Sequence, residues 1–374
     1  MEKDWLYRLA LNRVKGIGPV HAKTLFRHFG EADAIFREKP GTLQKITGIQ
    51  ADVAEAIAGF DDFPGVEKEL SFLQKHKIRC LFFMDAAYPQ RLLQYDTAPA
   101  ILFYLGNADL NASKIISVVG TRTPSEYGKA AVESLFNGLE IRDLLVVSGL
   151  AFGIDAAAHK AAINHQLLTV GVLGHGLDRI YPNENTGLAR QIIKQGGGLM
   201  TRFSMNTKAE EYNFPLRNRI VAGICDALIV VETAPRGGSM LTVGDALKYH
   251  KKIFAIPGRI TDKRSSGCNA LIREGKAILL SDFRQLIQEM KWDLFADKKG
   301  PAQAELFSPA LEGGSLSPTE KAILAILREK GVLSSDELMA ALQLSSGMAA
   351  MPLLNLELQG CVCSLPGKRY RLCT

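Results

Sequence analysis

The chain has 374 residues, 47% of them hydrophobic, which is enough for two or three domains with sizeable cores. It has no run of 18 apolar residues and no signal-peptide pattern at its start, so no membrane span is expected, and the six cysteines fit a reducing cytoplasm. The net charge is +6, and the whole basic excess falls within residues 110–290. Such a local surplus fits a polyanionic ligand, although solvated faces also produce it.

Residues 1–65 are predicted to be helical. Val14–Val20, VKGIGPV, and Leu43–Ile57, LQKITGIQADVAEAI, each place a glycine turn between two helical patterns. The pair resembles a SAM-like helix-hairpin-helix tandem, in which glycine amides can hold a DNA phosphate. The segment carries nine basic and nine acidic residues, so a helical module without a ligand, or with an auxiliary role, is the favoured interpretation.

Residues 66–290 are predicted to form an α/β core. Apolar strands separated by helical patterns indicate a Rossmann-like parallel sheet that is covered on both faces. Glycines follow several strands, and the carboxyl ends of parallel strands share one edge, so one ligand crevice is expected there. The strand candidates are Cys80–Met84, Ala100–Leu105, Ile115–Val119, Leu144–Ser148, Leu168–Leu173, Gly198–Thr201, Ala227–Glu232, Lys252–Ile256 and Ala277–Leu280.

A linker is predicted at residues 291–316, before a winged-helix domain at residues 317–374. Ser317–Glu320 is a helix-start signal, and two strand-like runs lie near the end of the sequence. The third helix expected near Ala349–Leu358 has no Lys or Arg, which a helix that reads DNA normally carries. A protein-interaction or regulatory role is therefore favoured for this domain.

The turn after Ile115–Val119 is the first candidate binding site. Gly120 allows close backbone approach, Arg122 offers a planar fork suited to phosphate, and a helix N-terminus follows near Gly128. Lys129, in the same helix start, is a further candidate contact. This arrangement predicts a phosphate-holding turn, for either a nucleotide or a nucleic acid.

A second candidate site lies in residues 213–223, NFPLRNRIVAG, where an aromatic residue and two arginines stand at a helix start. This combination can stack a base and clamp its phosphate, which is typical of single-stranded nucleic-acid binding. In the alternative interpretation, one arginine pairs with a neighbouring glutamate and the aromatic ring belongs to the core. The candidate residues are Phe214, Arg217, Asn218 and Arg219.

A third candidate is the RGGS turn after the strand that ends at Glu232. Gly237, Gly238 and Ser239 lead into a helix and predict a second glycine-rich anion site. Lys248, near the far end of that helix, is a weaker candidate. Its side chain is equally suited to solvent, where its positive charge would complement the negative end of the helix dipole.

Asp155 and His159 lie four residues apart, so they share one helix face. A pair that fixes the preceding loop is favoured over an acid/base or metal pair, because no third ligand is in register. His175, in a glycine loop after a strand, is a possible ligand contact. The sequence lacks a Walker lysine motif and a Gly-x-Gly-x-x-Gly fingerprint, and no nucleophile arrangement stands out, so no metal, cofactor or enzymatic activity is predicted.

Six motifs, taken in order, resemble the DNA-processing protein A family (DprA, also called Smf). They span roughly residues 80–290 and are GTRTPSEYG, SGLAFGIDAAAH, GHGLDRIYP, FPLRNRIVAG, GGSMLT and IPGRITDKRSSGCNALI. The resemblance implies an extended Rossmann-like core with a helical N-terminal domain and a winged-helix C-terminal domain. It also implies a cytoplasmic, non-enzymatic homodimer that binds single-stranded DNA, protects incoming strands and loads RecA in natural transformation.

The resemblance also assigns residues. Asn183 stands where many members carry a basic residue, which implies that a phosphate contact is lost. Arg202 stands where many carry an acidic one, which implies either an added cation near the site or a disturbed salt bridge. The DNA-pocket positions carried over are Arg122, Phe214, Arg217, Asn218, Arg219, Gly237, Gly238 and Ser239.

An alternative function comes from a second resemblance. The implied fold is similar to that of nucleotide phosphoribohydrolases of the lysine-decarboxylase-like group, in which a glycine loop and a glutamate hydrolyse a nucleoside monophosphate. Glu232 would be that glutamate, but the full Pro-Gly-Gly-x-Gly-Thr signature is missing. A protein-interaction scaffold with an incidental basic pocket is the third option.

Overall fold

The computed structural model describes residues 2–137, 141, 143–292, 317–342, 351–353, 355–357, 361–365 and 369–372. It divides into two compact units, Met1–Leu294 and Phe295–Thr374, each of which is described by itself. Most of the predicted linker and part of the helix predicted near Ala349–Leu358 lie outside the described residues, and the predicted domain boundaries stay predictions. Within the described ranges, no helix is both long and apolar enough to cross a membrane.

A nine-stranded sheet forms the centre of the first unit, in the order β1-β2-β6-β5-β4-β3-β7-β8-β9. Strands β3 to β9 run parallel, whereas β1 and β2 extend the sheet in antiparallel pairing next to β6. The predicted Rossmann-like α/β core is confirmed, and each predicted strand overlaps an observed one. The strands are β1 Arg79–Phe82, β2 Ile101–Gly106, β3 Lys114–Gly120, β4 Leu144–Ser148, β5 Leu168–Leu173, β6 Gly198–Thr201, β7 Ala227–Val231, β8 Lys252–Ala255 and β9 Ile278–Leu279.

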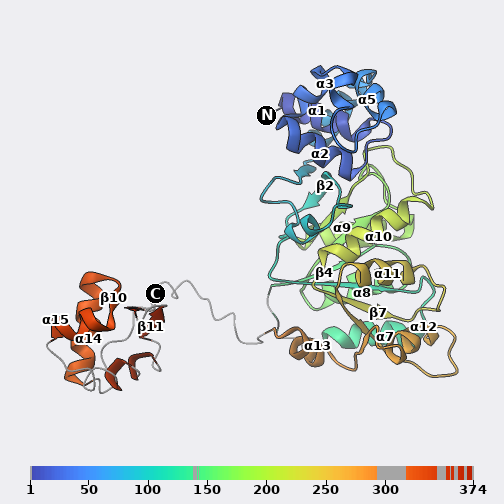
Figure 1. The fold of residues 1–374 in the computed structure, drawn as a ribbon. Coiled ribbons are helices and arrows are strands. Elements are labelled where there is room, and N and C mark those ends of the chain that lie inside the picture. The colour runs from blue at the N-terminus through green and yellow to red at the C-terminus, as the bar shows by residue number, and fades with distance from the viewer. Residues whose placement is uncertain are drawn as a thin grey trace. The chain divides into compact units, whose positions relative to one another are not determined.

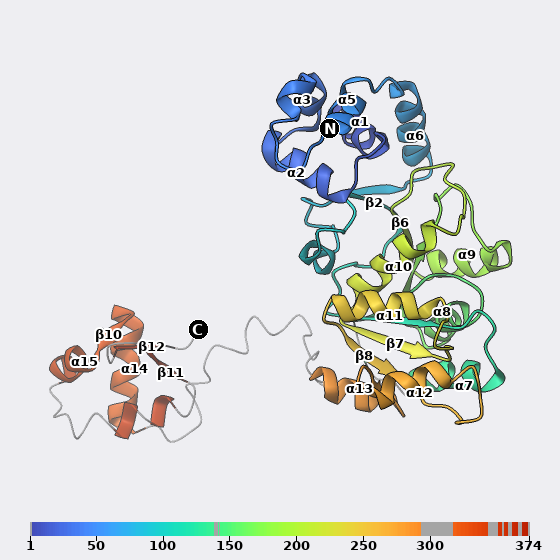
Figure 2. The ribbon, with the colours of Figure 1, turned by 45° about the vertical axis from the view of Figure 1, so that its right-hand side comes forward.

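Helices cover both faces of this sheet (Figure 2). Side chains alternate along β3, so Ile116 and Val118 pack with α7, α8 and α13, whereas Ile115 and Val119 pack with α10, α11 and α12. The covering helices are α7 Glu126–Phe136, α8 Ile154–Asn164, α9 Thr186–Lys194, α10 Asn213–Ile224, α11 Ser239–Lys248, α12 Ser266–Arg273 and α13 Phe283–Met290.

Strand order reverses at β3. Strands β4, β5 and β6 follow on one side of it, and β7, β8 and β9 follow on the other. The loops after β3 and β7 therefore lead away in opposite directions and leave a crevice outside the carboxyl ends of these strands. Both predicted glycine turns lie at this crevice.

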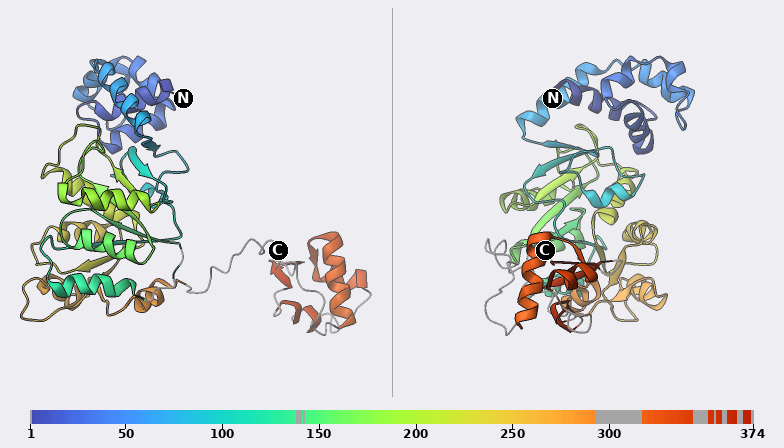
Figure 3. Two further views of the ribbon diagram at one scale, coloured as in Figure 1. Left: turned by 180° about the vertical axis from the view of Figure 1, so that it is seen from behind. Right: turned by 60° about the vertical axis from the view of Figure 1, so that its left-hand side comes forward.

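The N-terminal helices pack at the β1–β2 end of the sheet, and α12 and α13 lie at the opposite end (Figures 1 and 3). Gly16 and Gly48 take positive φ values of 84° and 91° in the turns before α2 and α5, which is why glycine is required there. The helices are α1 Glu2–Arg13, α2 Pro19–Phe29, α3 Ala32–Arg37, α4 Pro40–Leu43, α5 Ala51–Ala58 and α6 Phe63–Lys75. The predicted helix-hairpin-helix segment is confirmed.

Two buried polar groups fasten these helices to the sheet. The Glu69 carboxylate accepts hydrogen bonds from Arg13 Nε at 3.1 Å and from the Met205 amide at 2.7 Å. Lys23 Nζ donates to the Tyr95 carbonyl at 3.1 Å. Burial raises the pKa of Glu69, which Arg13 and the Met205 amide oppose, and burial lowers the pKa of Lys23, which Asp96 opposes.

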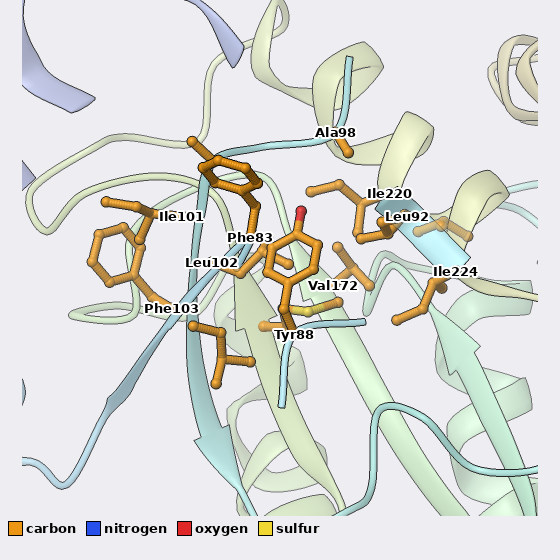
Figure 4. Packing of buried hydrophobic residues seen from close by; sticks show 14 of the residues in the cluster. Phe83, Tyr88, Leu92, Ala98, Ile101, Leu102, Phe103, Val172, Ile220 and Ile224 are labelled. Carbon is orange, nitrogen blue, oxygen red and sulfur yellow. The ribbon is translucent and has the colours of Figure 1, made fainter. Parts of the chain in front are cut away.

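Apolar packing continues from the helices into the sheet. The centroids of the Phe26 and Phe82 rings lie 4.5 Å apart. Both residues belong to one buried cluster, which continues between the sheet and the helices α10 and α11. Tyr88 stands in the same cluster among aliphatic residues of β2, β5 and α10 (Figure 4), and its hydroxyl donates to the Pro99 carbonyl at 2.6 Å. The helical segment and the core therefore share an interior.

The second unit contains a small winged-helix fold, as predicted. Ser317 begins it with a capping box, in which Ser317 Oγ accepts from the Glu320 amide at 3.2 Å and the Glu320 carboxylate accepts from the Ser317 amide at 2.7 Å. Its sheet has the order β10-β12-β11. The elements are α14 Pro318–Lys330, β10 Leu333–Ser334, α15 Ser335–Leu342, β11 Val362–Leu365 and β12 Arg369–Leu372.

Candidate nucleic-acid interface

A cleft of about 520 Å³ opens at the carboxyl ends of β3 and β7. Its walls come from the loops after β3, β4 and β7 and from the start of α10, so the predicted convergence of these loops is observed. The predicted site residues that line it are Gly120, Arg122, Phe214, Arg217, Asn218, Gly237, Gly238 and Ser239.

Close backbone contact shapes the first wall. A Cβ atom on Gly120 would collide with the backbone of β7 and with the first side chain of α8, so only glycine allows this approach. The Thr121 amide donates to the Glu232 carbonyl at 2.7 Å, and the Thr121 carbonyl accepts from the Ile154 amide at 3.1 Å. These bonds fix the loop on which Arg122 stands.

Arg122 and Phe214 form the exposed part of the cleft. The Arg122 side chain is exposed, and its guanidinium carbon lies 5.2 Å from the centroid of the Phe214 ring. Phe214 is half-buried, and a Cβ on Gly174 would lie 2.9 Å from its ring, so glycine makes room for the aromatic. An accessible cation beside an aromatic face is suited to a phosphate and a stacked base.

Arg217 turns into the protein. Its Nη1 donates to the Gly149 carbonyl and, at 2.7 Å, to the Val172 carbonyl, while Nε donates to Asn218 Oδ1 at 3.0 Å. Burial lowers the pKa of Arg217, and the nearby Asp155 carboxyl opposes this shift. These bonds give the side chain a structural task at the ends of β4 and β5, on the inner side of the cleft.

Asp155 fixes the loop before α8. Its carboxylate accepts from the Gly149 amide at 3.1 Å and from the Ala151 amide at 3.4 Å. Burial raises the pKa of Asp155, and Arg217 and the two amides counteract this. The interpretation of Asp155 as a loop-fixing residue is confirmed.

The prediction that His159 also fixes the loop before α8 is wrong, because His159 is a core residue that bonds to β5. Thr169 Oγ1 donates to the Val146 carbonyl at 2.8 Å, so the same hydroxyl accepts from His159 Nδ1–H at 2.6 Å. Burial lowers the pKa of His159 to about 3, which keeps the ring neutral. Across the residues that the structure describes, no group of three or more His, Cys, Asp or Glu side chains is placed to hold a metal ion.

Glu232 supports the start of α7. It has a positive φ of 46° and is buried, and its carboxylate accepts from the Ser125 amide at 2.8 Å and from the Ser125 hydroxyl. A Cβ atom on Gly128 would collide with the Glu232 carboxylate, so glycine is required at position 128. The carboxylate serves the helix start, whereas the hydrolase alternative needs it at the ligand.

The RGGS turn forms another wall of the cleft. Ser239 Oγ donates to Thr233 Oγ1 at 2.7 Å, which fixes the start of α11. A Cβ on Gly237 would lie 2.7 Å from the same Thr233 oxygen, whereas one on Gly238 would meet open space. The Gly237 amide donates to the Ala234 carbonyl at 2.9 Å, so the amides of Gly238 and Ser239 are the ones that an anion can approach closely.

Three family descriptions match this chain. DNA recombination-mediator protein A matches residues 79–291, the DprA winged helix domain matches residues 307–368, and a SAM-like helix-hairpin-helix tandem matches residues 9–58. The chain is 32% identical to protein Smf of Synechocystis sp., with 98% of each chain covered, and 32% identical to protein Smf of Escherichia coli, with 98% and 95% covered. The chain belongs to the DprA/Smf family.

Solved structures agree with this assignment. DprA from Streptococcus pneumoniae superposes with a TM-score of 0.66 and 34% identity, covering 76% of this chain and 97% of that one. DNA processing protein A from Helicobacter pylori gives a TM-score of 0.51 and 26% identity, covering 57% and 96%. The Helicobacter protein has a unique single-stranded DNA binding mode. The family resemblance of the six sequence motifs is confirmed.

Several residues predicted to join the DprA site lie elsewhere. Arg219 is exposed but does not line the cleft, because two helical positions separate it from Arg217 by more than half a turn. It lies in the electrostatic surroundings of Arg202 and Asp245 instead. Lys248, in the last turn of α11, is likewise near Asp245.

Arg202 and His175 are also placed away from the cleft. Arg202 lines a separate hollow of about 300 Å³ next to the first glycine hairpin, together with Arg13 and Gly18. His175 is buried, donates from Nδ1 to the Gly176 carbonyl at 2.9 Å and accepts at Nε2 from the Tyr181 amide at 3.2 Å. The ring thereby shapes its own loop.

One site residue was missed from the sequence. Phe152 lies in the loop between β4 and α8, lines the cleft and is 42% exposed. In the motif SGLAFGIDAAAH, the sequence predictions concern Asp155 and His159 only. An aromatic between Gly149 and Gly153, at a strand-to-helix turn, was the available signal.

Proposed function

We propose that this protein binds single-stranded DNA in the cleft and acts as a recombination mediator. The observation that carries the proposal is the exposed Arg122 guanidinium beside the half-buried Phe214 ring. Arg122 and the amides of Gly238 and Ser239 hold phosphates, and Phe214 stacks on a base. Because these contacts address the backbone and the face of a base, binding does not depend on sequence.

The recessed aromatic favours a single strand over a duplex. A base in a duplex is already stacked and paired, and reaching Phe214 would require it to leave that stack, which costs a few kcal/mol. A single strand offers its bases without this cost. The single-stranded DNA binding of the Helicobacter pylori relative supports the same preference.

We further propose the role that family membership supports. In this role the protein is a non-enzymatic, cytoplasmic homodimer that protects incoming single strands and loads RecA onto them in natural transformation. Two clefts on one dimer would engage the same strand, and the second contact would then form at a high effective concentration. The description of the matching family as a recombination mediator supports this assignment.

A titration with fluorescently labelled oligonucleotides tests the proposal. Single- and double-stranded DNA are compared at several salt concentrations, with the wild type, Arg122→Ala and the control Arg273→Ala, which removes an exposed arginine of α12. We expect preference for single strands, an affinity that falls steeply with salt, and a loss of about tenfold or more in Arg122→Ala alone. Salt-independent binding, or equal affinity of Arg122→Ala and wild type, would contradict the proposal.

The same preparation addresses the hydrolase alternative. Nucleoside monophosphates are incubated with the wild type and with Glu232→Gln, and free base is measured. We expect no release from either protein, because the Glu232 carboxylate is bonded to Ser125. Release by the wild type that is lost in Glu232→Gln would favour the hydrolase.

A further inference from the structure

A groove of about 730 Å³ runs between α7 and α8, next to the cleft. Arg122 and Phe152 line both hollows, so the groove and the cleft meet at these two side chains. From there the groove passes Lys129 on α7 and Lys160 on α8.

The groove has the chemistry of a nucleic-acid channel. Its exposed rim carries Lys160 in addition to Arg122, and also Lys129, which is paired with Glu126 at 2.7 Å. The acidic residue of the groove, Glu133, contacts Asn164 Nδ2 at 3.4 Å and His165 Nε2 at 3.2 Å, both at the end of α8. Alanines of α8 and the ring of Phe152 supply an apolar floor. Cations along a rim and apolar surface beneath them suit phosphates and bases respectively.

Phe152 is held at the junction by a constrained loop. Leu150 and Gly153, on either side of it, have positive φ values of 54° and 79°. A Cβ on Gly153 would collide with the backbone of the Arg122 loop, so the two loops pack directly against each other. The carboxylate of Asp155 fixes the loop further through the Ala151 amide. Backbone strain that presents an exposed aromatic is typical of a functional surface.

We infer that the DNA strand continues from the cleft over Phe152 into the groove between α7 and α8. Phe152 is a second stacking platform, and Lys160 contacts a phosphate beyond it. The inference rests on the proposed single-stranded DNA binding and adds the path of the strand. The groove is continuous with the cleft and has a basic rim. These two features favour a DNA strand over a protein partner, because a protein partner would not require a positively charged rim.

Oligonucleotides of increasing length test this path, from about 4 to about 16 nucleotides. Lys160→Gln is the decisive variant, since Lys160 lines the groove and not the cleft. The shortest strands should bind it like the wild type. The longest should bind it about three- to tenfold more weakly at low salt, with a salt slope that is smaller by about 0.7. Phe152→Ala should weaken the longest strands by about fivefold or more.

Two matched controls accompany these variants. Lys194→Gln removes an exposed lysine of α9, and Leu168→Ala removes an apolar side chain with the same 42% exposure as Phe152 at the start of β5. Neither should change binding at any length. Molecular mass by sedimentation is measured for Phe152→Ala, so that a protein contact at this ring is detected.

The outcomes separate the two proposals. If the wild type binds no single strand, the proposed function fails and the strand path with it. If Arg122→Ala weakens binding but Lys160→Gln follows the wild type at every length, only the strand path is overturned. A Phe152→Ala variant that changes mass and leaves long-strand affinity intact would also overturn it, because the ring would then serve an interface between proteins.

Discussion

Two arginines flank the same aromatic ring but perform different tasks. The guanidinium carbons of Arg122 and Arg217 lie 5.2 Å and 5.9 Å from the centroid of the Phe214 ring. Arg122 is exposed, whereas Arg217 is buried and bonded to the carbonyls of Gly149 and Val172. The exposed Arg122 guanidinium is accessible to a phosphate, whereas the buried Arg217 guanidinium stabilises the inner wall of the cleft.

Replacing Arg217 should therefore destabilise the fold. Arg217→Met leaves two carbonyls and the Asp155 carboxyl without their cation, so we expect the free energy of unfolding to fall by about 3–5 kcal/mol. Arg122→Met should change it by about 0.5 kcal/mol or less, as is usual for exposed positions. Urea denaturation measures both. A stable Arg217→Met protein with abolished DNA binding would instead assign Arg217 to the ligand.

His159 gives the fold a defined dependence on pH. Its pKa falls from an ordinary 6.5 to about 3 in the folded protein. Below pH 6.5 the unfolded chain takes up a proton that the folded protein does not, so stability is present above that value and declines as pH falls. Between about pH 6 and pH 4 this group contributes a loss of about 1.4 kcal/mol per unit.

The variant His159→Gln isolates this effect. It keeps a polar group near Thr169 but cannot titrate, so its free energy of unfolding should decline less steeply than that of the wild type over the same pH range. Urea denaturation at several pH values provides the comparison. Equal slopes for the two proteins would show that His159 is not responsible.

For single residues, the sequence predicted which side chains lie near the crevice but not whether each side chain turns into the protein or toward solvent. Arg122 follows the end of β3 and Phe214 lies at the start of the helix after β6, and these positions sufficed to place both at one crevice. The inward direction of Arg217 depends on the phase of α10 and on carbonyls of β4 and β5 that meet only in the folded sheet. Burial of His175 has a similar origin, since its partners come from its own folded loop.

At the scale of elements, close backbone approach forms the cleft. β3, β7 and α8 converge at Gly120, where no side chain fits. Gly120→Ala should therefore lower the free energy of unfolding by about 1–3 kcal/mol through overpacking.

A glycine inside α11 provides the matched control. A Cβ on Gly244 meets open space, so Gly244→Ala should raise the free energy of unfolding by about 0.5–1 kcal/mol through its better helix propensity. Chemical denaturation of both variants measures the difference. If Gly120→Ala were as stable as Gly244→Ala, the close approach would not constrain the cleft.

The strands were predictable because each is a short, mostly apolar run, and several of them are rich in β-branched residues. The directions of the strands were less predictable. The antiparallel attachment of β1 and β2 beside β6 was not predicted, because a sequence pattern does not report how a connecting segment returns to a sheet edge.

At the scale of the molecule, contacts within the first unit connect the cleft to the N-terminal helices. The buried Glu69 carboxylate joins α6 to the loop after β6, and Lys23 joins α2 to the loop before β2. The segment around α10 that carries Phe214 is therefore connected to the helix-hairpin-helix helices through packed contacts. The sequence predicted both parts, but these connections involve residues far apart in the chain.

Photocrosslinking locates the strand most directly. A single-stranded oligonucleotide carrying 4-thiothymidine is irradiated with the protein, and cross-linked tryptic peptides are identified by mass spectrometry. We expect the peptide of residues 209–217, which contains Phe214, to carry the nucleotide, with a lower yield in Arg122→Ala. Cross-links confined to residues 1–65 or 317–374, with none in 209–217, would contradict binding in the cleft.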